Sequence, residues 1–412
     1  MKKKKILVIS PIFPLPLKSG GQVRVFYLVK YLSESYDVSL LSLIGEEDKS
    51  YISEMAKYCS RIETVTGYIH DSLSEKLRSL LNPMQLKRIF RRIGQLAAGM
   101  PLQVCRFYHP EIESKLDKLM TEDDYEIVYA IYSQIAPYLE HAKILAPDAK
   151  LVLDDIDLAF VTKSRELVDK KGIKRLVASV ESKRMTEYVS KTWAGLDRII
   201  AMSEVDRGKL KELNEAMKVS VIPNGVDVNY FRPTSSKQQD NRIVFLGGSL
   251  HYPNVDAMAF FSREIFPLLQ NDIKDASLTV IGEFTERSVL QSVNPVILTG
   301  YVDDVRPHLA GGRVLVAPIR IGGGTRLKIL EAMAMGIPVV STAVGCEGID
   351  VTDGKDIFIA DDPILFAERI KLLLTDESIA AGLAQNGRRL VEQKYSWEAL
   401  LKGAGDLFQT CK

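Results

Sequence analysis

The chain has 412 residues, of which 46% are hydrophobic and 26% are charged. This composition is typical of water-soluble globular proteins and excludes fibrous and disordered classes. Lys and Arg number 54 against 53 for Asp and Glu, so the formal charge is +1 and there is no basic excess of the kind found in dedicated nucleic-acid-binding proteins. At roughly 100 to 200 residues per domain, this length predicts two or three domains.

The cysteines and the apolar runs indicate the cellular setting. Four cysteines lie far apart in the sequence, a spacing that favours neither a zinc site nor a disulfide framework and fits a reducing compartment. The basic start and the apolar run 6–9 imitate a secretory leader, but no small-residue cleavage site follows, so we read the run as a strand. Because no apolar stretch reaches about 18 residues, we expect no membrane-spanning helix and at most peripheral membrane contact. The reducing compartment indicated by the cysteines predicts a cytoplasmic protein.

Short apolar runs recur along the chain with amphipathic segments between them, which is typical of parallel strands buried on both faces. In chain order, the predicted strands are 5–10, 38–43, 127–131, 151–153, 198–201, 242–246, 278–281, 296–299, 314–317 and 339–341. Helices are predicted between them, for example at 23–35 and 256–269. We therefore expect an α/β protein with two Rossmann-like domains, each built on a doubly wound parallel sheet.

Turn chemistry predicts where the two domains meet. Pro223-Asn224-Gly225 is a strong turn signal, and 232–239 is the most linker-like stretch of the chain. We predict a hinge within 223–240, a first domain of residues 1–224 and a second domain of residues 225–394. One more amphipathic helix is predicted at 395–408.

The segment 318–340 runs from a strand through three glycines into a helix and on to the next strand. Glycines at such a turn let backbone N–H groups approach an anion, and the helix N-terminus favours negative charge. Gly323, Gly324 and Thr325 therefore predict a phosphate site. The alternative is a loose turn, and the segment contains neither a Walker A sequence nor a dinucleotide fingerprint, which disfavours an ordinary kinase, GTPase or dehydrogenase.

Three charged residues follow these glycines. Lys328 and Glu331 are three residues apart and share a helix face, where a cation suits a diphosphate and a carboxylate suits sugar hydroxyls. Arg326, a further catalytic candidate, is about 200° around the helix from Lys328. The alternative for Lys328 and Glu331 is an exposed ion pair, worth well under about 1 kcal/mol.

These residues resemble the retaining, GT-B-fold glycosyltransferases of family 4, and in particular a subgroup similar to exopolysaccharide-assembly enzymes. The stretches that carry the resemblance are 330–340, 221–227 with Phe231, 300–305 and 395–397. The resemblance implies that residues 1–224 bind the acceptor and residues 225–394 bind a nucleotide-sugar donor across a cleft. It also implies that the last helix, 395–412, crosses back to the first domain.

The resemblance implies roles for residues of the second domain. Glu331 matches the glutamate that binds the donor ribose, whereas Gly323 stands where the family usually has a second glutamate. The loop after 242–246 lacks the usual Arg and Lys, so Lys328 is expected to hold the diphosphate. The resemblance also implies that Gly282 and the backbone of Tyr301 and Val302 border the nucleobase, with simple turns as the alternative. Further donor-side candidates lie in the loop after 242–246, namely Gly247, Gly248 and His251.

The resemblance also marks residues of the first domain. Gly20 and Gly21 look like the acceptor-side glycine loop, although any strand-to-helix turn could use such a pair. Asp155 and Asp157, next to Asp154, would line the acceptor side. Three clustered carboxylates could bind a divalent metal, but helix capping or solvated charge is favoured, and the resemblance implies neither a metal nor another cofactor.

Residues 76–106 contain basic side chains and no acidic ones, with apolar residues at helical spacing among them. Such a basic amphipathic helix suits an anionic membrane surface. A solvated basic face is the equally weighted alternative, and nucleic acid is disfavoured by the nearly neutral chain.

The function predicted on these grounds is metal-independent transfer of a hexose from a nucleotide-diphosphate sugar to a glycan or lipid-linked acceptor, in synthesis of cell-surface polysaccharide or lipopolysaccharide. Two alternatives stay open: an inactive relative that binds nucleotide sugars as a scaffold, and a sugar-nucleotide epimerase on the same fold. The sequence leaves the sugar, the base, the acceptor, the linkage and the oligomeric state undetermined.

Overall fold

The computed structural model describes residues 3–66, 94, 99–156, 158, 172–234, 241–321 and 325–402. The chain divides into two compact units between Ile222 and Pro223. This division falls two residues before the predicted end of the first domain and at the start of the predicted hinge 223–240, of which 235–240 lie outside the described residues.

The first unit is built on a seven-stranded parallel sheet in the order β3-β2-β1-β4-β5-β6-β7. The strands are β1 (Lys4–Ser10), β2 (Tyr36–Ile44), β3 (Arg61–Thr66), β4 (Ile127–Ile131), β5 (Lys150–Asp154), β6 (Arg198–Ala201) and β7 (Val219–Val221). The direction of strand order reverses between β1 and β4, so a topological switch point lies there.

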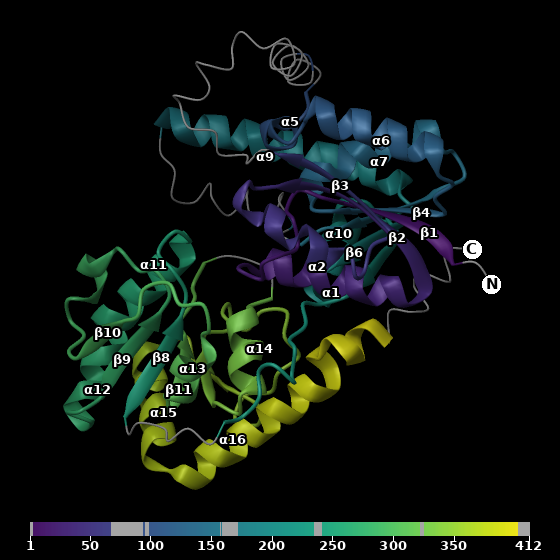
Figure 1. Cartoon of the computed structure of the whole chain (residues 1–412). Helices are drawn as coiled ribbons and strands as arrows, with labels where there is room; N and C mark the ends of the chain where they lie inside the picture. Colours follow the sequence, from purple (N-terminus) through teal and green to yellow (C-terminus); the bar gives the residue numbers. More distant parts are fainter. Residues whose placement is uncertain are drawn as a thin grey trace. The chain divides into compact units, whose positions relative to one another are not determined.

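Helices cover both faces of this sheet (Figure 1). On one face, α1 (Gly20–Ser35) and α2 (Ile52–Met55) pack on side chains such as Ile6 and Val8. On the other, Leu7 and Ile9 meet a group of helices. Those helices are α6 (Pro110–Glu122), α7 (Ala136–Leu145), α9 (Gly172–Thr192) and α10 (Glu204–Leu213). Because successive side chains alternate between two covered faces, the strands read as continuous apolar runs.

The second unit repeats this plan with a six-stranded parallel sheet in the order β10-β9-β8-β11-β12-β13. The strands are β8 (Arg242–Leu246), β9 (Ser277–Ile281), β10 (Val296–Leu298), β11 (Val314–Ala317), β12 (Val339–Ser341) and β13 (Phe358–Ile359). Its switch point lies between β8 and β11. The predicted pair of doubly wound parallel-sheet domains is therefore confirmed.

Two apolar clusters hold the second sheet between helices. The first joins β8, β9 and β11 to α11 (Tyr252–Phe260), η4 (Phe261–Ile265), α12 (Phe266–Asp272) and α15 (Pro363–Thr375). The second joins the opposite face to α13 (Arg306–Ala310) and α14 (Leu327–Ala334). The helix predicted at 256–269 is thus interrupted by η4, which is a π-helical turn.

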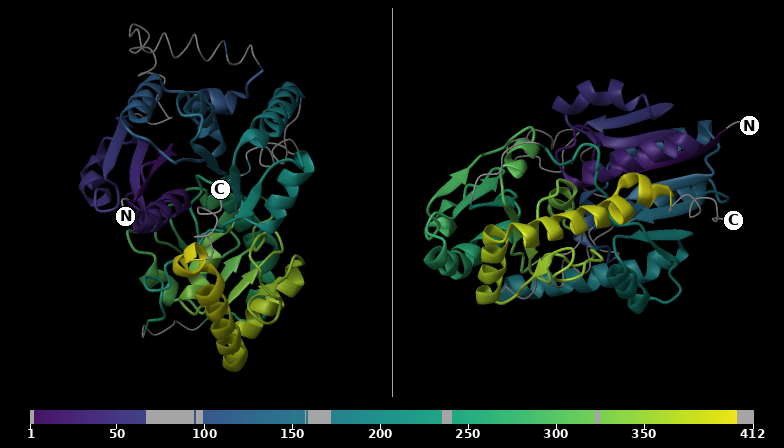
Figure 2. Two further views of the ribbon diagram at one scale, coloured as in Figure 1. Left: turned by 90° about the vertical axis from the view of Figure 1, so that its right-hand side faces the viewer. Right: turned by 90° about the horizontal axis from the view of Figure 1, so that it is seen from below.

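The described end of the chain belongs to the second unit. Helix α16 (Glu377–Leu390) continues into the π-helical turn η6 (Val391–Tyr395) as one rod, drawn in yellow in Figure 2. Ser396 then forms a bridge with Val226, whose N–H donates to the carbonyl of Tyr395 at 2.8 Å. These hydrogen bonds tie residues 395–397 to the second unit, whereas the predicted crossing to the first domain falls on residues that the structure does not describe. Residues 403–412 lie outside the described residues.

Arg388 of α16 joins three segments of the second unit. Its guanidinium donates to the carbonyls of Ala334, at the end of α14, and of Phe231. It also pairs with Glu392 at 2.7 Å. Because the last carbonyls of a helix have no partners within the helix, Arg388 caps the C-terminal end of α14.

Candidate functional site

The candidate donor site lies at the carboxyl ends of the strands of the second sheet, where open α/β sheets bind ligands. The loop after β8 carries Gly247 and Gly248, the loop after β9 carries Gly282, and α14 follows β11 across the switch point. Hydrogen bonds join the first two loops, since Gly247 N–H donates to Ile281 O at 2.8 Å and Ser249 N–H donates to Glu283 O at 2.9 Å.

Two of these glycines leave no room for a side chain. A Cβ at Gly247 would lie 2.7 Å from the Asn254 amide, and one at Gly248 would lie 2.9 Å from the carbonyl of Glu283. Gly282 has a φ of +122°, a conformation that favours glycine. The glycines therefore let the two loops approach closely at the strand ends.

Lys328 lies on the first turn of α14, and its ammonium contacts the loop after β8. Lys328 Nζ donates to Asn254 Oδ1 at 2.9 Å and lies 4.4 Å from the centre of the Phe245 ring. The Asn254 amide nitrogen in turn donates to the carbonyl of Gly248 at 2.8 Å. The buried Asn254 thus links the predicted diphosphate-binding lysine to the glycine loop.

The charges around Lys328 shift its protonation. Burial lowers the pKa of Lys328 to about 7, the positive charge of Arg326 acts in the same direction, and Glu331 opposes both. Burial also raises the pKa of Glu331 to about 7, against the effect of Lys328. An anionic ligand would favour the charged ammonium and offset the cost of its burial.

Arg326 and His251 add to this basic environment. Arg326 is the N-cap residue of α14, so the helical angle of 200° expected from Lys328 does not apply, and its charge acts on Lys328. Desolvation, followed by the charges of Arg326 and Lys328, lowers the pKa of His251. The predicted donor-side residues Lys328, Arg326 and His251 are therefore electrostatically coupled.

The other predicted donor-side residues are distributed as follows. Thr325 is 8% exposed, and its hydroxyl has no hydrogen-bond partner among the described residues. Tyr301 is exposed, whereas Val302 packs against the second apolar cluster. Gly323 and Gly324 lie outside the described residues.

In the first unit, the predicted acceptor-side glycines begin α1. Ser19 caps this helix by accepting from the N–H of Gln22, and Gly21 packs against Tyr132, which follows β4. A Cβ at Gly21 would lie 2.0 Å from the Tyr132 hydroxyl. Tyr132 itself has a φ of +74°, which is strained for a residue with a side chain.

Substituting Gly21 by alanine is expected to destabilise the first unit by about 1 to 3 kcal/mol, because the added methyl overpacks against Tyr132. Urea unfolding measures this change. Gly21→Ala combined with Tyr132→Phe, which removes the clashing hydroxyl, should recover part of the loss, since the close approaches to Ile12 Cδ1 at 2.9 Å and to the ring carbon Cζ at 3.2 Å remain. Equal destabilisation of the single and double variants would contradict the contact.

The three aspartates near residue 155 do not share one environment. Asp154 is fully buried and accepts from Arg24 Nε at 2.9 Å and from the Tyr129 hydroxyl at 2.8 Å. The sequence analysis favoured a helix cap or a solvated charge here, and for Asp154 this expectation is wrong, because the carboxylate is buried and paired. Asp155 is also buried, and Asp157 lies outside the described residues. Among the residues that the structure describes, no group of three His, Cys, Asp or Glu side chains could hold a metal ion.

Of the predicted membrane-binding segment 76–106, the structure describes only residues 94 and 99–106. Across the described parts of the chain, no helix combines the length and the apolar character needed to cross a membrane.

Sequence reasoning missed Asn254, Phe245 and Arg24 as site or supporting residues. Asn254 lies in the Tyr-Pro-Asn stretch that begins α11. In the sequence, this stretch was notable only because it lacks the Arg and Lys usual in the family. Asn254 and Lys328 are separated by 74 residues in the sequence, so no local pattern predicts their contact. Arg24 likewise lies 130 residues from Asp154.

Residues 240–376, which make up most of the second unit, match the model of the family described as glycosyl transferases group 1. The two Rossmann-like units and the similar solved structures identify the fold as GT-B.

Two curated relatives are similar in sequence. An uncharacterized 44.6 kDa protein in the cps region of Klebsiella pneumoniae is 22% identical and covers 95% of this chain and 96% of its own. The capsular polysaccharide biosynthesis glycosyltransferase CapM of Staphylococcus aureus is 29% identical over 49% of this chain, and the match spans 60% of CapM.

Two solved structures share the fold over nearly the whole chain. Sucrose-phosphate synthase from Thermosynechococcus elongatus has a TM-score of 0.69 at 18% identity and covers 99% of this chain and 98% of its own. Anabaena HepE, solved in complex with UDP-glucose, has a TM-score of 0.63 at 16% identity and covers 98% of this chain and 99% of its own.

Proposed function

We propose that the chain is a retaining glycosyltransferase of family 4 that transfers a hexose from a nucleotide-diphosphate sugar to a hydroxyl of a glycan or lipid-linked acceptor. The reaction would serve synthesis of cell-surface polysaccharide or lipopolysaccharide. The name of CapM and the cps-region relative support this setting, and the UDP-glucose complex of HepE supports a nucleotide-sugar donor.

The observation that carries the proposal is the position of Lys328. It lies on the first turn of α14, its Nζ is held 2.9 Å from Asn254 Oδ1, and it borders the glycine loop at the switch point of the sheet. A cation at a helix N-terminus and beside close-packed glycines suits a diphosphate.

In the proposed reaction, the bond between the anomeric carbon and the diphosphate oxygen breaks, and negative charge develops on the leaving group. Lys328, with the helix N-terminus, stabilises this charge in a partly dehydrated site. Glu331, as a carboxylate, accepts hydrogen bonds from the ribose hydroxyls and orients the donor. Arg326 adds positive charge beside Lys328, and no metal or other cofactor is assigned a role.

The acceptor is assigned to the first unit, with Gly20, Gly21 and Asp155 on its side. We also propose a cytoplasmic location, which the widely spaced cysteines support, with docking at the inner face of the cell membrane through the basic segment 76–106.

A thermal-shift screen against UDP-, GDP-, ADP- and TDP-sugars tests the donor assignment. One nucleotide class should stabilise the fold by about 2.7 kcal/mol at 100 times its Kd, and Lys328→Met should reduce the shift. Binding without transfer or donor hydrolysis would favour the inactive relative, whereas isomerised sugar nucleotide formed without an acceptor would favour the epimerase. If no nucleotide sugar stabilises the protein, the proposal is wrong.

Donor binding is expected to weaken as the pH rises above about 7. In the free protein, the pKa of Lys328 is about 7, and a bound diphosphate raises it. At low pH, Lys328 is therefore protonated in the free protein and in the complex, whereas at pH 8 it is protonated mainly in the complex. Binding UDP at pH 8 should therefore take up a proton, which calorimetry in buffers of different ionisation enthalpy measures. His251 is already neutral at this pH because its pKa is lowered, so Lys328→Met should reduce the uptake.

A further inference from the structure

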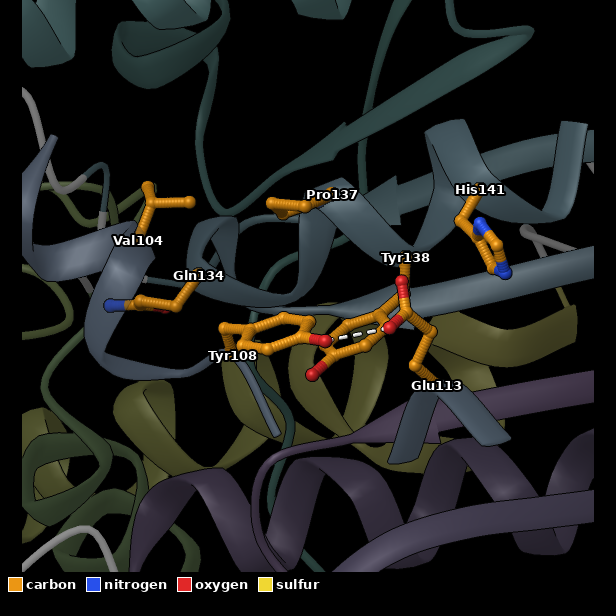
Figure 3. Close-up of a pocket in the computed structure, with 7 residues that line it drawn as sticks. All are labelled: Val104, Tyr108, Glu113, Gln134, Pro137, Tyr138 and His141. Atoms are coloured by element: carbon orange, nitrogen blue, oxygen red, sulfur yellow. Dashed lines mark hydrogen bonds between the residues drawn. The ribbon is translucent and has the colours of Figure 1, made fainter. Parts of the chain in front are cut away.

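Polar side chains of the first unit gather in a pocket between α5 (Leu102–Arg106), α6 and α7 (Figure 3). There the Tyr108 hydroxyl donates to Glu113 Oε2 at 2.7 Å, and His141 Nε2 lies 2.6 Å from Asp117 Oδ1. These contacts join α6 to the segments beside it. In the second unit, by contrast, one ion pair has both of its partners close in sequence to residues of the donor site.

Arg320 and Asp256 form this pair. Arg320 follows β11, and its Nε and Nη2 donate to the two carboxylate oxygens of Asp256, on α11, at 3.1 and 2.7 Å. The guanidinium also lies 4.5 Å from the centre of the ring of Phe260, the last residue of α11. A two-pronged contact of this kind fixes both the distance and the orientation of the groups that it joins. Arg320 therefore holds α11 against the segment that leaves β11.

The same helix carries Asn254, which accepts from Lys328 at 2.9 Å. Asp256 follows Asn254 by two residues, so the two side chains lie about 200° apart around the helix. Lys328 and Arg320 therefore contact α11 on nearly opposite sides. Two such contacts oppose rotation of the helix about its axis, which one contact alone would allow.

The N-terminal end of α11 is less closely packed than the rest of the helix. Leu250, just before the helix, is 97% exposed, and Tyr252, its first residue, is 60% exposed. Ala257 and Met258, which are fully buried, come one turn later. Polar contacts therefore have a large part in placing Asn254.

The exposure of the ion pair separates a positioning role from a stabilising one. The Arg320 side chain is 44% exposed and that of Asp256 is 12% exposed. An ion pair that is open to solvent contributes little to stability. A displacement of Asn254, in contrast, would act directly on the ammonium of Lys328, which it contacts.

We propose that Arg320 is a positioning residue of the donor site: by holding Asp256, it keeps Asn254 where it accepts a hydrogen bond from Lys328. The inference rests on the proposed function, because Lys328 is there the cation that meets the donor diphosphate. Arg320 acts through α11 and not on the donor itself.

Titration of Lys328 in the full chain without nucleotide tests the first step. With lysine labelled with ¹³C, the NMR signal that is lost in Lys328→Met identifies this residue, whose pKa is about 7 in the free protein. In Arg320→Met, water should reach the loosened ammonium, so the pKa of Lys328 should move upward, toward its ordinary value. Asp256→Ala should give the same upward movement, and the two changes together should add little to either one.

Calorimetry with UDP at pH 6, where Lys328 is protonated in the parent and in the variants, tests the second step. Arg320→Met and Asp256→Ala should each weaken UDP binding by about three- to tenfold, because the ammonium is no longer held in place for the diphosphate. Their thermal unfolding should stay close to that of the parent, as expected for an exposed pair.

Lys371→Met is the matched control. Its ammonium pairs with Asp272 at 2.7 Å and is 47% exposed, so it removes an ion pair of similar length and exposure from the same unit. It should leave both the titration and the affinity unchanged. The inference is overturned if Lys328 titrates in Arg320→Met as it does in Lys371→Met, or if a parent that binds UDP loses no affinity through Arg320→Met. If no nucleotide sugar stabilises the parent but the titration moves as expected, the positioning role stands and the donor assignment falls.

Discussion

Lys328→Met should lower turnover by about 10²- to 10³-fold, the usual effect of removing one donor that stabilises developing negative charge. Methionine keeps the apolar stem that packs near Phe245 but lacks the ammonium that donates to Asn254 at 2.9 Å. Turnover is measured as release of nucleoside diphosphate from the sugar nucleotide identified by thermal shift.

Two further variants separate chemistry from folding. Lys402→Ala, at a side chain that is 74% exposed, should leave turnover and stability unchanged. Asn254→Ala removes the acceptor that positions Lys328 and should lower turnover less than the loss of the ammonium itself. Near-normal turnover of a folded Lys328→Met variant would show that the diphosphate charge is stabilised elsewhere.

Arg24→Met should destabilise the first unit by about 3 to 5 kcal/mol, because it leaves the charge of Asp154 buried without its cation. The two side chains are 2% and 0% exposed and lie 2.9 Å apart. Arg24 also donates to the carbonyl of Ile222 at 3.0 Å, so the substitution removes a second hydrogen bond at the end of the unit. The burial of Tyr129 raises its pKa, so its neutral hydroxyl remains as a donor to Asp154.

Fluorescence-detected urea unfolding can follow the first unit alone. The chain has two tryptophans, and Trp193 lies in the core of the first unit while Trp397 lies in the second. A Trp397→Phe background leaves Trp193 as the reporter. Arg24→Met combined with Asp154→Leu should regain part of the lost stability, since no unpaired charge then remains. A single variant as stable as its parent would refute the role of the pair.

The sequence predicted the sheets well where strands are buried on both faces. β1, β4, β8 and β11 read as continuous apolar runs, and each was expected within a residue of its observed bounds. β3, which lies at a sheet edge and has only two apolar residues, Ile62 and Val65, was missed. An edge strand has one neighbour and is less buried, so its apolar pattern is weaker.

The site was predictable only where its geometry is local. Three-residue spacing places Lys328 and Glu331 on one helix face, and their mutual influence in the structure agrees with that spacing. The contact of Lys328 with Asn254 and the packing of Gly21 on Tyr132 depend on strand order. Such contacts follow from the tertiary fold and leave no periodic signal in the chain.

The capping of α14 by Arg388 determines which segment of the second unit can be exchanged between relatives. The helix that begins beside Lys328 ends at a carbonyl held by α16, 54 residues further along the chain. A chimaera that transplants only the matched family segment, residues 240–376, would separate α14 from this partner. A graft that keeps α14 intact should therefore extend through 402, so that α16, η6 and the bridge to Val226 are transferred together with α14.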